Sequence, residues 1–354
     1  MKIKLAILDS NANYLTRMVT SFGTKYADKI ELYSFSDKDL ALSTLHSARI
    51  DVFIASDSYE IQIDEIPTRC AFAYFVESAD IESVNNEKAI CKFQKAELIY
   101  KQILSLYAEK AENLSGIRID DDSCKVYGFV SVGGGSGSSS MAAACALRFA
   151  RQGKRTLYLN FEKYGTADSY FGSEGQFTIS DVIFALKSKK SNLSLKLESN
   201  VRQDPRGVYY YAGAPVLLDI LELKSDDIIR LISELRLTGG YDYIVLDTDF
   251  GLDEETMKLL HSVTVLTLVS NGSETDITKL SRALTALDII EQGDDTRLTD
   301  KMRIAYNMFS NKTSKTLGGI EIKEIGGAPR YQYASTSEVV EALSALDIFD
   351  KIEE

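Results

Sequence analysis

The sequence predicts an α/β protein of two domains, each built around a largely parallel sheet. Short apolar runs that fit buried strands alternate along the chain with longer stretches in which apolar residues recur at helical spacing. This alternation is typical of a parallel sheet that is covered by helices on both faces. The chain has 354 residues, of which 45% are hydrophobic. That length is sufficient for two domains of ~100–200 residues with separate cores.

The first series of elements occupies residues 1–111. An apolar strand at residues 2–8 is followed by Asp9, and apolar residues at helical spacing then cover residues 13–26. Further strands are predicted at residues 30–35, 51–55, 71–76 and 89–93, and further helices around residues 40–45 and at residues 96–111. We therefore expect a small five-stranded α/β domain.

A linker is expected at residues 112–124, which lack a sustained period and concentrate Asp, Ser and Gly. The second α/β domain then covers residues 125–354. Its predicted strands are residues 126–132, 156–160, 208–211, 243–247, 263–269 and 302–307. Its predicted helices include residues 141–152, 179–186, 225–237, 276–287 and 337–346.

Charge and apolar patterning narrow the classes of partner. There are 40 Lys and Arg residues against 52 Asp and Glu residues, which gives a formal net charge of -12. Nucleic acid is disfavoured, because proteins bind it non-specifically by neutralising phosphates with Lys and Arg. No apolar run reaches the ~18–20 residues of a membrane span, and the first strand meets Asp9 too soon for a signal peptide. We expect a cytoplasmic protein.

Cysteine and histidine spacing argues against a metal centre of the zinc type. The four cysteines are Cys70, Cys91, Cys124 and Cys145, and no pair of them forms a C-x-x-C motif. The two histidines, at positions 46 and 261, cannot form an H-E-x-x-H motif. Free thiols and structural histidines are expected.

The first domain resembles a response-regulator receiver, whose fold is flavodoxin-like. A receiver has two acids after its first strand, a phosphoacceptor Asp after its third and a Lys after its fifth. Here only Asp9 follows the first strand, and Ser56 stands at the acceptor position. Asp57 comes one residue late, which points its side chain to the other face. Lys92 stands at the Lys position. A hard cation needs several oxygen ligands, and Asp9 alone is left to supply them. We therefore expect a protein–protein module that is not phosphorylated.

A glycine-rich loop follows the first strand of the second domain. Four glycines lie within five positions, at residues 133, 134, 135 and 137, and an Ala-rich helix that opens with serines comes directly after them. Glycines let the backbone approach an anion, and the free N–H groups of a helix start favour negative charge. This order of strand, loop and helix is typical of a phosphate-binding loop.

The loop resembles the deviant Walker A loop of the MinD/ParA group of P-loop ATPases, which reads Lys-Gly-Gly-x-Gly-Lys-Thr/Ser. Gly133 replaces the signature Lys, and Ser138 replaces the P-loop Lys. Asn160 and Glu162 occupy the place of the Asp-x-Asp segment of the group. The resemblance implies ATP at Gly134, Gly135, Ser136, Gly137, Ser138, Ser139 and Ser140, with Asn307 and Pro329 near the base, and Mg²⁺ at Ser139 and Asp247.

The two absent lysines favour binding over turnover. Removing one charge-stabilising donor typically costs a site ~10²–10³ in rate, and this loop lacks two cations. We therefore expect an ATPase that is very slow or inactive, and no residue is assigned a catalytic role. Lys163 is a candidate substitute cation, although a Lys in such a loop is usually solvated. A decayed loop that binds nothing is the simplest alternative.

A serine hydrolase is an alternative of a different class. Ser136 lies on a strand-turn-helix segment, and an acid and His261 follow it in the order that such enzymes use. The G-x-S-x-G motif is not satisfied, however, because Ser138 stands where the second Gly is required. His261 also lies in helix-like sequence. This alternative therefore receives little support.

Over essentially its whole length the chain is similar to the TadZ/CpaE family, which couples a receiver-like domain to a MinD/ParA-type domain. Residues 160–171, 179–186 and 207–215 carry the similarity together with the loop. It implies a localisation or assembly factor for tight-adherence (Flp) pili, an ATP-supported homodimer, and pilus-assembly or pole-localised protein partners. The acidic stretch 338–354 argues against direct membrane insertion. A working ParA-like partitioning ATPase and a phosphorylation-controlled regulator are the alternatives.

Overall fold

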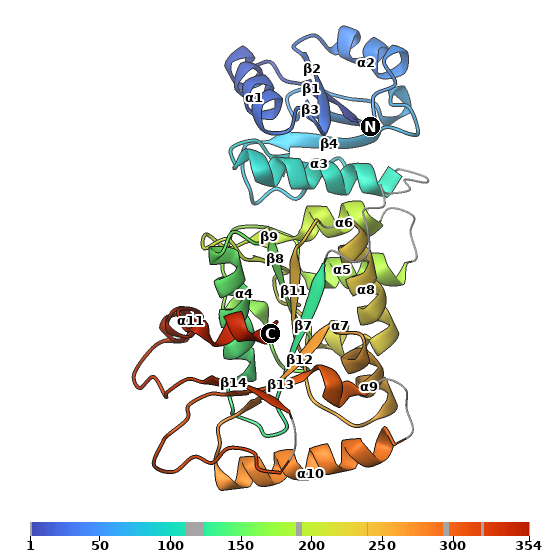
Figure 1. The fold of residues 1–354 in the computed structure, drawn as a ribbon. Coiled ribbons are helices and arrows are strands. Elements are labelled where there is room, and N and C mark those ends of the chain that lie inside the picture. The colour runs from blue at the N-terminus through green and yellow to red at the C-terminus, as the bar shows by residue number, and fades with distance from the viewer. Residues whose placement is uncertain are drawn as a thin grey trace. The chain divides into compact units, whose positions relative to one another are not determined.

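The computed structural model describes residues 2–110, 124–188, 193–238, 240–292, 297–319 and 322–353 (Figure 1). The chain divides into two compact units. The N-terminal unit comprises Met1–Gly116 with Lys189–Ser199, and the C-terminal unit comprises Ile117–Ser188 with Asn200–Glu354. Except for Cys124, the predicted linker lies outside the described residues. Both units are α/β and contain a mainly parallel sheet, which confirms the predicted fold class.

The N-terminal unit contains a sheet in the order β2-β1-β3-β4-β6-β5. Only β5 runs antiparallel, as half of a hairpin with β6. The sequence predicted five strands, and β5 is the additional one, because two residues are too short to show a period. The strands are β1 Ile3–Leu8, β2 Ile30–Phe35, β3 Val52–Ser56, β4 Ala71–Val76, β5 Ser83–Val84 and β6 Glu87–Cys91, and the helices are α1 Ala12–Lys25, α2 Lys38–Ser47 and α3 Ala96–Lys110.

Helices cover both faces of this sheet. Strands β3 and β4 are buried along their whole length, which explains their continuous apolar sequence. One core lies between the sheet and the helices α1 and α3, and a second lies on the side of α2. The side chains of Asn11 and Asp37 accept hydrogen bonds from the first turns of α1 and α2, which fixes where these helices begin.

A helix from far along the chain completes the N-terminal unit. Helix α6, Leu193–Asn200, contributes Leu195 to the edge of the core beneath α3. Lys196 Nζ donates a hydrogen bond of 2.7 Å to Ser105 Oγ, and Tyr100 OH donates one of 3.3 Å to Glu198. The boundary expected at residue 111 therefore does not describe the whole unit, because this pairing joins segments that are about 90 residues apart.

The C-terminal unit contains an eight-stranded sheet in the order β14-β13-β12-β7-β11-β8-β10-β9, in which β9 alone is antiparallel. The predicted strands lie within two residues of their observed bounds, whereas β9 and β14 were not predicted. The strands are β7 Lys125–Val130, β8 Thr156–Asn160, β9 Arg202–Gln203, β10 Tyr209–Tyr210, β11 Tyr243–Asp247, β12 Val265–Ser270, β13 Met302–Tyr306 and β14 Lys323–Gly327.

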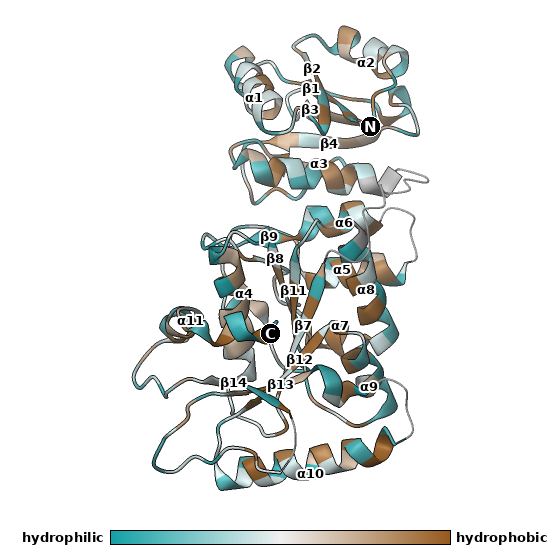
Figure 2. Cartoon of the chain, viewed as in Figure 1, coloured by the Kyte–Doolittle hydropathy of each residue, from teal (hydrophilic) through white to brown (hydrophobic). Residues whose placement is uncertain are grey.

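Helix α4, Ser138–Arg151, is the central helix of this unit. Its residues from Met141 to Leu147 are fully buried, and its alanines allow it to pack closely against β7, β8 and β11. The other helices are α5 Ile179–Lys187, α7 Leu217–Leu221, α8 Ser225–Thr238, α9 Glu254–His261, α10 Glu274–Ile290 and α11 Thr336–Ser344. Helix α10 is amphipathic, with apolar and polar residues alternating along it in Figure 2.

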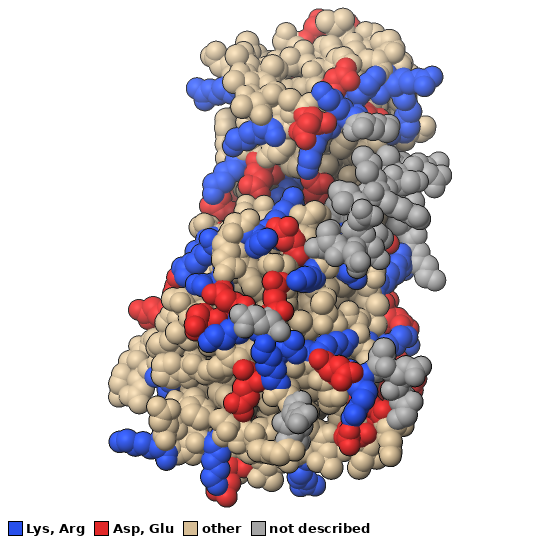
Figure 3. Space-filling view, viewed as in Figure 1, with Lys and Arg blue, Asp and Glu red and all other residues tan. Residues whose placement is uncertain are grey.

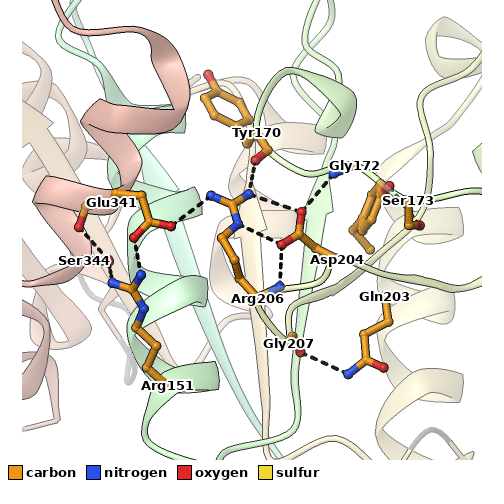
Figure 4. A network of polar contacts seen from close by, with 11 residues as sticks. Arg151, Tyr170, Gly172, Ser173, Gln203, Asp204, Arg206, Gly207, Glu341 and Ser344 are labelled. Carbon is orange, nitrogen blue, oxygen red and sulfur yellow. Dashed lines mark hydrogen bonds and ion pairs between the residues drawn. The ribbon is translucent and has the colours of Figure 1, made fainter.

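A polar network joins α4, α11 and the turn between β9 and β10 (Figure 4). Arg206 donates hydrogen bonds to Asp204 and to the backbone oxygen of Tyr170, and it also contacts Glu341. Arg151 contacts Glu341 and Ser344 from the other side. Burial raises the pKa of Asp204, but the hydrogen bonds from Arg206 and Gly172 outweigh this and hold it below its usual range.

No helix in the described part of the chain is long and apolar enough to cross a membrane.

Candidate functional site

A cavity of about 340 Å³ lies at the carboxyl ends of the central strands of the C-terminal unit. In open parallel sheets this edge is where ligands bind, and the volume falls within the ~300–1,000 Å³ of small-molecule sites. The walls come from the loop after β7, the first turn of α4, and the loops after β8 and β11. The lining residues are Ser131, Gly134, Gly135, Gly137, Ser138, Ser139, Ser140, Glu162, Tyr170, Thr248, Asp249 and Phe250.

The glycine-rich loop has the backbone geometry of an anion cradle. Gly135 and Gly137 both have a φ of 79°, a backbone conformation that residues other than Gly rarely adopt. A Cβ atom added at Gly134 or Gly135 would meet no atom within 4 Å. The backbone of these two residues therefore borders open space, and a phosphate group can approach it closely.

The start of α4 supplies further donors. Ser138, Ser139 and Ser140 form its first turn and line the cavity. The N–H groups of a first helical turn have no partner within the helix, and the helix dipole favours negative charge there. Ser136 Oγ is buried and has no hydrogen-bond partner among the described residues. The first turn of α4 therefore offers donors to an anion, whereas Ser136 does not line the cavity.

Asp247 lies at the end of β11 and is fully buried. The strand register places it beside Asn160. Its Oδ2 atom accepts hydrogen bonds of 2.7 Å from Tyr158 OH and of 2.7 Å from Asn160 Nδ2. Its Oδ1 atom has no partner in the described part of the chain. Burial, followed by the charge of Glu162, raises the pKa of Asp247 well above its ordinary value, while the hydrogen bonds from Tyr158 and Asn160 oppose this rise.

The two residues predicted at magnesium are thus brought to one place. Ser139 Oγ donates a hydrogen bond of 2.8 Å to Glu162 Oε2, so that a second carboxylate lies beside the predicted pair. Hydroxyl and carboxylate oxygens are the ligands that Mg²⁺ prefers. The orphaned Oδ1 atom of Asp247 and the open cradle over Gly134 and Gly135 fit a triphosphate with its metal ion.

The position of the signature lysine is filled by an acid. A Cβ atom added at Gly133 would lie closer than 3.0 Å to Oδ1 of Asp276. Asp276 belongs to the first turn of α10 and accepts hydrogen bonds from Ser270 Oγ (2.6 Å) and from Asn271 N (2.9 Å). The loop has therefore lost a cation at position 133 and has an anion against its backbone there.

The residues predicted near the base lie outside the lining of the cavity. Asn307 is buried, and its Nδ2 atom donates a hydrogen bond of 2.9 Å to the backbone oxygen of Ser136. It therefore holds the loop itself. Pro329 is exposed beyond the end of β14, and neither residue is among those that line the cavity. Contact of Asn307 and Pro329 with a nucleotide base stays a prediction.

Several lining or supporting residues were not predicted. Thr248, Asp249 and Phe250 follow Asp247 directly, so adjacency to the strand end was an available signal. Tyr158 is two residues before Asn160 on β8 and therefore shares its face. Asp276 had no local signal, because it reaches the loop from another helix. The backbone N of Lys163 donates to Asp249, and its side chain is exposed.

The geometry gives no support to hydrolase chemistry at Ser136. His261 lies at the end of α9, where its Nε2 atom is 3.1 Å from Glu291 Oε1. Neither Ser136 nor His261 lines the cavity.

The corresponding edge of the N-terminal sheet is closed around an ion pair. Lys92 Nζ lies 3.6 Å from Asp9 Oδ2 and 3.1 Å from Glu77 Oε1, and the side chains of Lys92 and Asp9 are buried. Ser56 is buried and hydrogen-bonded to Ser58 Oγ at 3.0 Å, whereas Asp57 is exposed.

Within the described residues of both units, no group of three or more His, Cys, Asp or Glu residues could hold a metal ion.

The fold and the two sites define a receiver-like domain followed by a P-loop ATPase-like domain of the MinD/ParA type. A ParA family ATPase from Chlorobium tepidum has 17% sequence identity over 66% of this chain and 97% of its own, with a TM-score of 0.51. MinD of the MinC:MinD complex of Aquifex aeolicus has 16% identity over 65% of this chain and 94% of its own, with a TM-score of 0.50. At these identities the likeness shows the fold alone.

Residues 1–108 match the family model described as the TadZ-like receiver domain. Residues 1–108 of the N-terminal unit are therefore similar to a TadZ-like receiver domain, and the combination with a MinD/ParA-type fold matches the TadZ/CpaE architecture. Comparison with curated proteins gave no match.

Proposed function

We propose that the C-terminal unit binds ATP with Mg²⁺ at the loop 133–140, and that bound nucleotide supports a homodimer. The open cradle over Gly134 and Gly135 at the start of α4 carries this proposal. Ser139, Glu162 and Asp247 would hold the metal ion. When bound, the ion would neutralise phosphate charge in the place of the absent lysines.

Hydrolysis is proposed to be weak or absent. The positions of the two lysines are occupied by Gly133, which faces Asp276, and by Ser138. The lining residues of the cavity, which are all described, include no Lys or Arg. Without a cation to stabilise the charge of phosphoryl transfer, each lost donor lowers the rate by ~10²–10³. Nucleotide would then act as an assembly signal.

The biological role that we propose is localisation or assembly of a tight-adherence (Flp) pilus machinery, with pilus-assembly or pole-localised proteins as partners. The TadZ-like receiver domain supports it. The MinD of Aquifex aeolicus, which is named in a complex with MinC, supports a protein partner for this fold. On the face in view in Figure 3, Lys and Arg are interspersed with Asp and Glu, an arrangement that favours protein contact over DNA.

Calorimetric titration of the full chain with ATP and Mg²⁺ tests the binding proposal. We expect saturable binding to the wild type and at least a tenfold loss of affinity in Gly134→Val, whose added side chain would enter the space of the phosphates. Gly318→Val is the matched control, because a Cβ atom there also meets nothing within 4 Å and lies outside the cavity. Absence of wild-type binding, or equal binding by Gly134→Val, would overturn the proposal.

A further inference from the structure

Helices α5 and α7 of the C-terminal unit expose large apolar side chains together. Helix α7 has no buried residue, although three of its five residues are Leu. Keeping apolar surface in water is unfavourable, and soluble monomers rarely expose it contiguously. The exposed fractions range from 40% to 83% in Tyr164, Phe184, Val216, Leu217, Leu218 and Leu221. We call these six residues the α5–α7 face.

The size of this face is that of an interaction surface. Two of its members are aromatic, and aromatic side chains bury ~150–250 Å² each. Tyr164 and Phe184, at 83% and 70% exposure, therefore approach the ~300–600 Å² of the largest apolar patch on a typical monomer. The four aliphatic residues bring the surface toward the ~800 Å² that each partner contributes to a standard interface.

A recess lies directly beside the protruding residues. A second cavity, of about 250 Å³, is lined by Tyr164 and Leu217 of the α5–α7 face together with the apolar residues Ile179, Tyr211 and Ile220. The same face therefore carries apolar projections and a hollow that is lined by both apolar and polar groups. Such a surface can be complementary to itself across a two-fold axis, where each copy fills the hollow of the other.

The charges around the face have both signs. Lys187 on α5 lies 3.6 Å from Glu222, just after α7, and Asp219 accepts a hydrogen bond from Ser180. Asp181 and Lys163 are also exposed nearby in the chain. A rim of mixed sign does not select a strongly basic or acidic partner, whereas it suits a second copy that presents the same charges in reverse order.

We propose that two copies of this chain associate through the α5–α7 face, with α7 of each copy against the recess of the other. The inference rests on the homodimer of the proposed function and names its surface. The recess also adjoins the phosphate site: Tyr158 and Asn160 line it, and both side chains hydrogen-bond to Asp247. The recess and Asp247 therefore share two supporting side chains.

Sedimentation equilibrium of the full chain over a concentration series, with and without ATP and Mg²⁺, tests the surface. We expect Leu218→Asp and Phe184→Asp to weaken the dimer at least tenfold. Both residues are exposed, so the midpoint of thermal unfolding should change little, and calorimetry at concentrations where the wild type is monomeric should find the affinity of the monomer for ATP unchanged. The matched control is Ile289→Asp, which removes a similarly exposed apolar side chain from α10 and should leave the dimer intact.

The outcomes separate the two proposals. If the wild type is a dimer and both variants remain dimers, the α5–α7 face is not the interface, although the proposed homodimer stands. If the wild type stays monomeric at every concentration with and without nucleotide, the homodimer itself fails. As a second measurement, Leu218→Cys should form an intermolecular disulfide under mild oxidation and Ile289→Cys should not; equal cross-linking of the two would also overturn the proposal.

Discussion

The receiver-like site and the phosphate loop have both lost charged residues that their fold classes use, but they have lost them differently. In the N-terminal unit the retained Lys92 lies against Asp9 and Glu77, and the acceptor position is a buried serine. In the C-terminal unit the lysines are gone, yet a cavity of about 340 Å³ and unpartnered oxygens remain. In the first site the retained charges pair with one another, although Asp9 Oδ2 accepts no hydrogen bond from a described residue. The second site has no such ion pair among its lining residues and borders open space.

The difference shows that a site without the reactive residues of its fold class can be either filled by its own side chains or left open. A charge that is kept must find an internal partner, because burying it alone is costly. A phosphate cradle depends mainly on backbone geometry, so we expect Gly135, Gly137 and the start of α4 to bind an anion without the lysines.

Lys92→Met should destabilise the N-terminal unit by about 3–5 kcal/mol, because it leaves the buried carboxylate of Asp9 without its ion-pair partner. Scanning calorimetry of the full chain measures the effect. Adding Asp9→Asn should recover much of the loss. Lys38→Met, which removes a partly exposed ion pair to Glu65, is the control and should cost about 0–1 kcal/mol. Equal effects of the two Lys variants would show that Lys92 does not stabilise the buried carboxylate of Asp9.

Gly133→Lys should destabilise the C-terminal unit by about 1–3 kcal/mol, because its Cβ atom would overlap Asp276 and force it from Ser270 and Asn271. Ser138→Lys should be tolerated better, since its side chain can enter the cavity that Ser138 lines. Ser138→Lys should also raise the affinity for ATP, which titration measures. If Gly133→Lys were as stable as the wild type, Asp276 would not be what excludes a lysine there.

Acidification should narrow the stability difference between the wild type and Arg206→Met. Arg206 holds the pKa of Asp204 below its usual range against the effect of burial, so this contribution is present above the unfolded pKa of ~3.9. It is lost as the pH falls through the folded pKa. Chemical unfolding between about pH 6 and pH 3 measures it. This ion pair lies outside both sites and serves as a reference in which both charged partners are present. A stability difference that stays constant across that pH range would contradict the stabilisation of the Asp204 carboxylate by Arg206.

Acetyl phosphate with Mg²⁺ should leave the N-terminal unit unmodified. Asp57 is exposed and lies one residue beyond the buried Ser56, and Lys92 is engaged by Asp9 and Glu77. Intact-mass measurement should find no phosphoryl adduct. An adduct mapped to Asp57 by peptide sequencing would support the phosphorylation-controlled alternative instead.

Much of the fold could be predicted because strong local signals agree with it. Strands β3, β4 and β11 are continuous apolar runs that are buried on both faces. Strands β5 and β9, of two residues each, carry no period to detect. Helix α6 was missed for another reason, because its packing partner lies about 90 residues away in the sequence.

The candidate site shows the same division. The loop could be predicted from its glycines, since only Gly adopts the φ of 79° at residues 135 and 137 without strain. Contact of Asn307 with a base stays a prediction, whereas its hydrogen bond to the backbone oxygen of Ser136 was not predicted. A side chain that meets the loop from another strand leaves no trace in the residues around it.

Residue type at a fixed local spacing is enough to predict the two α/β units, the glycine-rich loop without lysines and the serine at the acceptor position. Three contacts could be found only in the folded chain: Asp276 against Gly133, Tyr158 and Asn160 on Asp247, and α5 beside α7, both with exposed apolar side chains. These contacts depend on which segments the two sheets bring together, and no local pattern encodes that proximity.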